Sequence, residues 1–148
     1  MPLPPDQPPD AESLVFTADP AAVRAALARL IAAPPMQDLT AGDRGKVELV
    51  LAEVLNNVAE HAYAGGSGPV EVGLCSTPLG IACRIVDRGL AMPGGKLPEG
   101  GLPSAPPDDL PEGGFGWHLI RSLTADLTYA RSAGQNRLSF LIPLTLAE

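Results

Sequence analysis

The sequence predicts an α+β fold in two layers, a mostly antiparallel mixed sheet covered on one face by three helices. Two observations lead to this expectation. Segments with strand-like alternation come in neighbouring pairs joined by short turns, as antiparallel hairpins do. Three segments have apolar residues at helical spacing and lie between the strands. The expected order is strand, helix, helix, strand, strand, loop, helix, strand, strand.

The length and composition of the chain indicate one domain behind a short tail. The 148 residues fit a single domain over residues 11–148, and the proline-rich residues 1–10 are expected to be disordered. Only 4% of the residues are aromatic, so aliphatic side chains must fill the core. The net charge of −7 argues against nucleic acid or an anionic membrane as a partner, because both reward clustered Lys and Arg.

Neither a targeting segment nor a membrane-spanning segment is visible in the sequence. The N-terminal residues lack the apolar core of a signal peptide, and no stretch approaches the roughly 18 apolar residues of a membrane span. We therefore expect a cytoplasmic protein, with Cys75 and Cys83 reduced and packed on strands as small hydrophobic residues.

The first half of the chain should form a strand and two helices. Residues 12–17 should form a short strand, and Asp19 followed by Pro20 is typical of a helix start. Pro34 ends that helix, and a second helix should begin after Thr40 and end at the next pair of glycines. Its apolar residues, which should face the core, are Val47, Val50, Leu51, Val54 and Val58.

The second half of the chain should contain two antiparallel hairpins. Residues 69–75 and 81–86 form the first, with Asp87 at the end of its second strand. Residues 125–131 and 137–144 form the second.

A long stretch without periodicity separates the hairpins. Residues 88–113 are rich in proline and glycine, and a loop of this length within a compact domain is expected to be a functional lid. A helix should begin near Gly114 and bury one face through Phe115, Leu119 and Leu123.

Glu53 and Asn57 lie one helical turn apart beside the apolar stripe. Carboxylate and amide oxygens are hard ligands that suit a Mg²⁺ ion shared with phosphates and water. Glu53 could also act as a general base toward a hydroxyl or water that attacks a γ-phosphate. Asn57 in mid-helix needs a reason such as metal ligation, since Asn is a poor helix former. The plainer alternatives are that Glu53 is an ordinary exposed glutamate and that Asn57 is merely tolerated in the helix. Asn56 supports the second alternative, since two adjacent asparagines cannot both be explained by one metal site.

Two glycine-containing segments follow in the order that a nucleotide site needs. Asp87 at a strand end could accept a hydrogen bond from the amino group of adenine, and Gly89 would let the backbone approach the base. Gly114 and Gly116 open a helix, where unpaired amides and the helix dipole favour phosphate. Taken singly, each segment has a plainer alternative, a common turn or a flexible hinge.

Together these motifs resemble those of the GHKL (Bergerat-fold) ATPases, and within them the anti-sigma-factor serine/threonine kinases. The most specific part is Glu53, Asn57, His61 and Tyr63 at their spacing along one helix. The resemblance implies the Bergerat fold, Glu53 as catalytic base, Asn57 as Mg²⁺ ligand, and ATP with Mg²⁺ as cofactors. The positions that it assigns to cofactor binding are Asn57, Asp87, Gly89, Gly114, Phe115, Gly116 and Asn136.

The same resemblance implies a partner-switching regulator. Such a protein sequesters a sigma factor or another effector, phosphorylates a small antagonist protein on serine or threonine, and often forms a homodimer. The sequence departs from the family pattern at Ala91 and Glu112, where glycine is frequent, and at Asn136, near a frequent threonine. These departures favour the alternative of a non-catalytic binding module of the same fold. A histidine kinase is disfavoured, since both histidines, His61 and His118, lie within the nucleotide domain.

Overall fold

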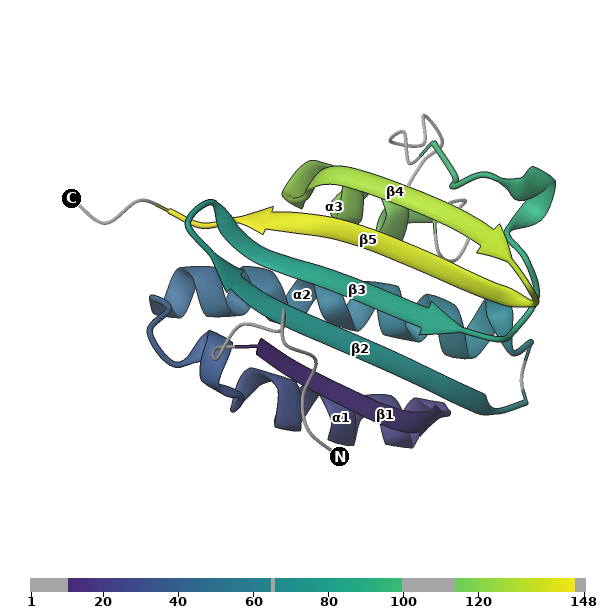
Figure 1. The fold of residues 1–148 in the computed structure, drawn as a ribbon, viewed down its shortest axis with the longest axis horizontal. Helices are drawn as coiled ribbons and strands as arrows, with labels where there is room; N and C mark the ends of the chain where they lie inside the picture. The colour runs from purple at the N-terminus through teal and green to yellow at the C-terminus, as the bar shows by residue number, and fades with distance from the viewer. Residues whose placement is uncertain (1–10, 65, 100–113, 146–148) are drawn as a thin grey trace, which may run out of the picture.

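The computed structural model describes residues 11–64, 66–99 and 114–145, and it contains one five-stranded sheet (Figure 1). The strand order is β1-β2-β3-β5-β4, and all four neighbouring pairs are antiparallel. The α+β expectation is confirmed, but the described strands contain no parallel pair, so the sheet is not mixed. The strands are β1 Ala11–Ala18, β2 Gly68–Thr77, β3 Gly80–Asp87, β4 Ala125–Ser132 and β5 Gln135–Pro143.

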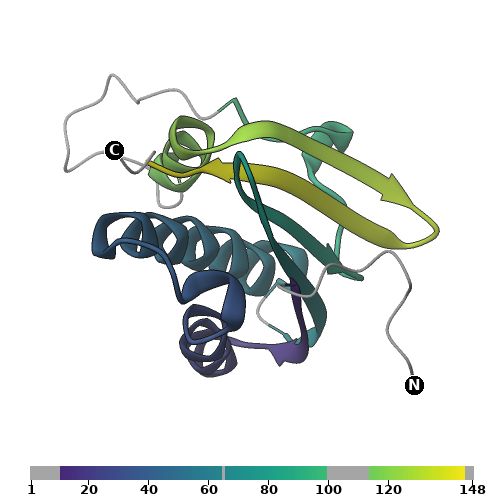
Figure 2. The same cartoon turned by 60° about the vertical axis from the view of Figure 1, so that its left-hand side comes forward.

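Three α-helices cover one face of the sheet and leave the other face open (Figures 1 and 2). The helices are α1 Pro20–Ile31, α2 Ala41–Asn57 and α3 Gly114–Leu123. Short turns of other helix types are η1 Pro34–Met36, η2 Val58–Ala62 and η3 Pro93–Gly95. No helix of the described residues is long and apolar enough to cross a membrane. The expected tail, residues 1–10, and residues 100–113 of the expected lid lie outside the description.

Side-chain caps fix where α1 and α2 begin. The Asp19 carboxylate accepts a hydrogen bond from Ala22 N at 2.8 Å, and the Thr40 hydroxyl accepts one from Asp43 N at 3.1 Å. The buried Asp43 carboxylate accepts hydrogen bonds from the backbone N and the hydroxyl of Thr145. The first turn of α2 is thereby tied to the chain that leaves β5.

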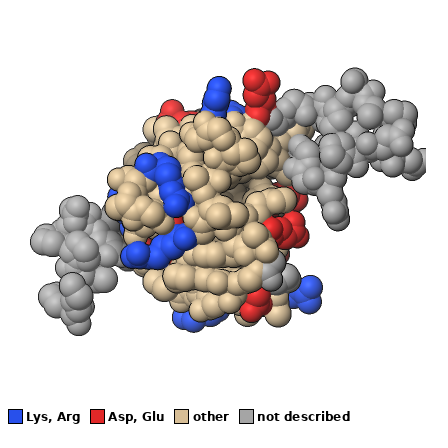
Figure 3. Space-filling view, turned by 90° about the vertical axis from the view of Figure 1, so that its right-hand side faces the viewer, with Lys and Arg blue, Asp and Glu red and all other residues tan. Residues whose placement is uncertain are grey.

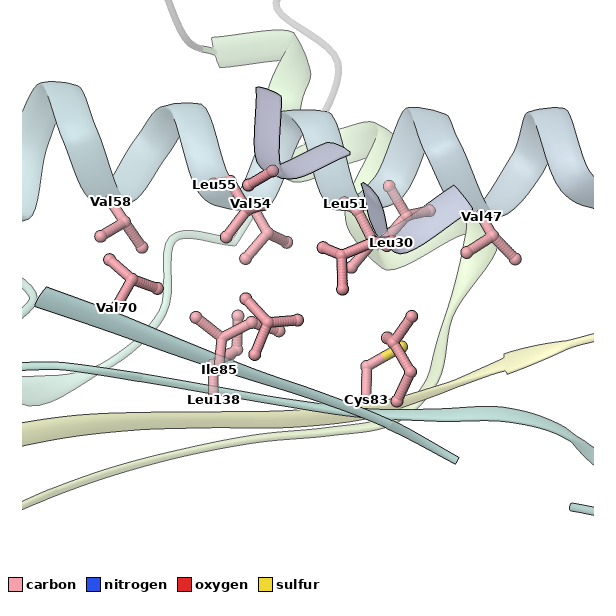
Figure 4. Packing of buried hydrophobic residues seen from close by; sticks show 14 of the residues in the cluster. Leu30, Val47, Leu51, Val54, Leu55, Val58, Val70, Cys83, Ile85 and Leu138 are labelled. Carbon is pink, nitrogen blue, oxygen red and sulfur yellow. The ribbon is translucent and has the colours of Figure 1, made fainter. Parts of the chain in front are cut away.

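The core lies between α2 and the sheet (Figure 4). Side chains of α2 point toward Val70, Ile85 and Leu138, which come from three neighbouring strands. Burying each such aliphatic side chain contributes about 1.5–3 kcal/mol. Cys83 is 4% exposed, and burial raises the pKa of its thiol, as expected for a cysteine that serves as a small hydrophobic residue. The predicted stripe is buried throughout, at Val47, Val50, Leu51, Val54 and Val58.

Two details of the helices differ from the expectation. The α-helix ends at Asn57, and the chain continues to Ala62 as a wider π-type turn instead of reaching the glycine pair in one regular helix. On α3 the buried residues are Trp117 and Ile120, whereas Leu119 is only partly buried. Phe115 was expected on that face, but its side chain lies outside the description. The close approach of α3 to α2 at Gly116 sets this rotation of the helix.

Candidate functional site

Helix α2 places Asn57 and Glu53 on the side of the helix that faces α3. Asn57 is 9% exposed and Glu53 is half-buried, while the neighbouring Asn56 points to solvent. The structure therefore separates the two asparagines that the sequence left equivalent. Because residues four apart lie one above the other on a helix, Glu53 and Asn57 open onto the same space.

The side chain of Asn57 makes no hydrogen bond within the described part of the chain. Its Nδ2 atom is fully buried and is one of two buried side-chain polar atoms there that lack a partner. Leaving such a group unpaired costs about 1–3 kcal/mol. A buried, unpaired amide nitrogen at the last residue of α2 therefore makes Asn57 a candidate position for contact with a ligand.

The first turn of α3 lies directly against this pair. A Cβ atom at Gly116 would stand 2.7 Å from Glu53 Oε2 and 3.8 Å from Asn57 Nδ2. Any larger residue would displace the carboxylate, so the glycine keeps the space between the helices clear. Gly114 begins α3, and the first turn of a helix presents backbone amides with the positive end of its dipole.

The turn η2 connects the α2 side of the site to the segment that follows β3. The Ala62 carbonyl accepts a hydrogen bond from Leu90 N at 2.7 Å. Gly89 lies so close beneath it that a Cβ there would overlap the Ala62 carbonyl. The turn η2 follows directly on Asn57, and its last residue, Ala62, contacts Gly89 and Leu90. The motif of Glu53 and Asn57 and the motif of Asp87 and Gly89 therefore lie at one end of the molecule.

Asp87 and Asn136 form a buried pair at this end of the sheet. They lie opposite each other on β3 and β5, and each residue is 5% exposed. Asp87 Oδ1 accepts hydrogen bonds from Gly89 N and from Asn136 Nδ2, both at 2.8 Å. The other carboxylate oxygen, Oδ2, accepts none from the residues that the structure describes. This leaves one oriented acceptor for a donor group of a ligand.

Three further residues hold this end together: Tyr63, which the motif includes without a stated role, and two that the sequence did not assign to the site. The Tyr63 hydroxyl accepts from Arg88 N at 2.8 Å and donates to Pro69 O at 2.5 Å. Burial raises the pKa of Tyr63, and the hydrogen bond from Arg88 opposes that rise. The other two residues are Tyr129 and Arg131, both bonded to Asn136. The strand-like alternation of β4, which places both on one face, was the only available signal.

The described part of the expected lid is anchored to the sheet and to α3. Met92 N donates to the Tyr129 hydroxyl at 3.0 Å, and Arg121 Nε donates to the Pro98 carbonyl at 2.8 Å. Ala91, where the related pattern has glycine, is exposed. The tight backbone contact is at Gly89, so a side chain at position 91 meets no comparable obstacle.

The residues present fit a metal that is shared with a ligand. No three His, Cys, Asp or Glu residues gather into a metal site among the described residues. Mg²⁺ commonly takes one or two protein oxygens and completes its shell with phosphates and water. Asn57 Oδ1 and the Glu53 carboxylate could supply such an incomplete set of oxygen ligands, while the unpaired Asn57 Nδ2 could donate to an acceptor of the ligand.

Figure 3 shows the end of the molecule at which β3 ends. Lys and Arg side chains form a group at the left of this view, and a group of Asp and Glu lies at the right, while charges of both signs are also visible at the top and bottom. A separate hollow lies on the open face of the sheet, and it shares no residue with the predicted site. Its lining includes small residues such as Gly73, Ala82 and Ser139.

Comparison with known proteins gives one family. The sequence model of one protein family, the histidine kinase-like ATPase domain, matches residues 16–142. This range is most of the chain and includes every predicted site residue. No curated protein matches the chain.

Proposed function

Because the chain belongs to the histidine kinase-like ATPase domains, which bind ATP, we propose that it is a Mg²⁺-dependent protein serine/threonine kinase. In this proposal it acts as an anti-sigma-type partner switch. It sequesters a sigma factor or another effector, and it phosphorylates a small antagonist protein that then no longer competes for the kinase.

The observation that supports catalysis is the meeting of Glu53, Asn57 and Gly116 in one place. A protein that only binds nucleotide has no need of a carboxylate at the phosphate end of its site. Here the glycine of α3 leaves room for Glu53 Oε2, and the unpaired amide of Asn57 lies beside it. A base and a metal ligand at this spacing suit phosphoryl transfer.

Each residue then has a definite task. Asp87 Oδ2 accepts from the exocyclic amine of adenine, and Gly89 lets the base lie against the backbone. Asn57 Oδ1 serves as a metal ligand, and the first amides of α3 face the phosphates. When bound, Mg²⁺ neutralises charge on the β- and γ-phosphates. Glu53 accepts the proton of the attacking serine or threonine hydroxyl.

Labelled ATP tests this assignment. The pure protein is incubated with γ-labelled ATP, Mg²⁺ and the protein fraction of its source cells, and label on serine or threonine is measured. We expect Glu53→Gln to reduce transfer at least about a hundredfold, the lower range for a general base, while ATP affinity changes little. Asn56→Gln, on the exposed side of α2, is the matched control and should transfer at the wild-type rate.

A non-catalytic, partner-sequestering module of the same fold remains the second candidate. The departures from the glycine pattern at Ala91 and Glu112 favour it. Tight ATP binding with no label transfer by the wild type would support the module and contradict the kinase.

A further inference from the structure

The amide of Asn136 uses its whole hydrogen-bonding capacity within the protein. Its Oδ1 accepts from the Tyr129 hydroxyl at 2.6 Å and from Arg131 Nη1 at 3.1 Å. Its Nδ2 donates to Asp87 Oδ1 and to the Leu90 carbonyl, both at 2.8 Å. A carboxamide has two N–H donors and two acceptor lone pairs, so these contacts leave nothing for a ligand.

Tyr129 and Arg131 determine which end of the amide faces Asp87. Arg131 can only donate, and the Tyr129 hydroxyl already accepts from Met92 N and has its proton left to donate, so the Asn136 oxygen faces both. A reversed amide would place that oxygen against the Asp87 carboxylate and the Leu90 carbonyl, and two acceptors in contact are unfavourable. The two side chains of β4 therefore keep Asn136 Nδ2 directed at Asp87.

The fixed amide in turn orients the Asp87 carboxylate. With Gly89 N and Asn136 Nδ2 both on Oδ1, the carboxylate cannot rotate without losing two hydrogen bonds. Its Oδ2 is then held as an acceptor that offers no proton. Such an atom attracts an amino group and disfavours a carbonyl oxygen.

We propose that Asn136, held by Tyr129 and Arg131, is the positioning residue that sets base specificity at this site. Through Asp87 it selects a purine nucleotide with an exocyclic amine at position 6 over one with hydrogen or oxygen there. This inference rests on the proposed nucleotide site. It gives Asn136 an indirect role in place of the direct contact that the family resemblance implied.

The same network joins base recognition to the segment after β3. The Tyr129 hydroxyl also accepts a hydrogen bond from Met92 N. The Leu90 carbonyl accepts one from Asn136 Nδ2, and Leu90 N donates one to the Ala62 carbonyl. The position of residues 88–92 and the orientation of Asp87 are therefore set together.

The test compares two nucleotides that differ by one amino group. ATP and 6-deamino-ATP, the purine riboside triphosphate, are titrated into the wild type and into Tyr129→Phe. We expect the wild type to bind ATP about tenfold or more tightly than 6-deamino-ATP, because a hydrogen bond to a charged group contributes at least that much to affinity. In Tyr129→Phe the preference should fall below about threefold, mainly through weaker ATP binding, because Asn136 has lost a donor that fixes it.

Tyr63→Phe is the matched control. It removes a hydroxyl that, like that of Tyr129, accepts from a backbone N of the segment after β3, but it does not contact Asn136, so it should weaken the binding of both nucleotides equally and keep their ratio. Arg131→Gln provides a second reading if Tyr129→Phe does not fold, since Arg131 is exposed and supplies the other donor.

Three outcomes would overturn the inference. Full preference for ATP in both the Tyr129 and Arg131 variants would show that Asn136 is not positioned by them. A wild type that binds both nucleotides equally would contradict base selection by Asp87 while leaving ATP binding intact. A wild type that binds neither nucleotide would refute the proposed site itself.

Discussion

Asn57 illustrates a conflict between stability and function at a single residue. Its amide nitrogen is buried without a partner at the last residue of the longest helix, and leaving a polar group buried and unpaired is unfavourable. Proteins accept such costs at sites that hold a ligand. The neighbouring Asn56, on the same helix, is exposed and can hydrogen-bond to water, so it does not carry the cost of a buried unpaired amide.

The Asn57→Leu variant separates the two effects. We expect its Tm without nucleotide to exceed that of the wild type, since the change removes a buried unpaired group that costs about 1–3 kcal/mol. ATP binding should lose its dependence on Mg²⁺, as followed by calorimetric titration with and without the ion. Asn56→Leu is the control and should leave both properties nearly unchanged. A lower Tm, or Mg²⁺-dependent binding in Asn57→Leu, would contradict the assignment.

At the scale of elements, the contact between α2 and α3 shapes the proposed phosphate end of the site. Gly116 lets the first turn of α3 approach Glu53, and the same contact turns Trp117 and Ile120 into the core. Hydrophobic spacing alone favoured another face of α3, because a single sequence does not show where a neighbouring helix touches. The buried face of α2 was predictable, since its apolar stripe depends only on local periodicity.

Gly116→Ala tests this contact. Alanine favours a helix over glycine by about 1 kcal/mol, so the fold should persist, but the new Cβ would displace the Glu53 carboxylate. We expect phosphoryl transfer to fall by more than about tenfold, the effect of misplacing a catalytic group, with the far-ultraviolet circular dichroism unchanged. Gly45→Ala on α2, which meets nothing within 4 Å, is the control. Equal activity in the two variants would show that Glu53 does not act from this position.

For the whole molecule, the arrangement of layers decides what can reach the site. The helices cover one face of the sheet, and the site lies at the end where β3 and η2 meet (Figure 1). The element order, the hairpins and the motifs that resemble the ATPase family were predictable, because all are local in sequence. The network around Asn136 was not, since it joins β3, β4 and β5 through pairings between residues far apart in the chain.

The open face of the sheet has a hollow that is a competing location for a small molecule. Its hollow includes Cys75 and Arg84 and lies across the sheet from α2 and α3. None of the motifs that led to the nucleotide assignment reaches that face.

A crystal structure with a non-hydrolysable ATP analogue and Mg²⁺ tests the central claim most directly. The account predicts the adenine amine within hydrogen-bonding distance of Asp87 Oδ2, the metal on Asn57, and the phosphates at the first turn of α3. An analogue bound on the open face of the sheet, or one whose phosphates lie away from Asn57 and Gly116, would contradict it.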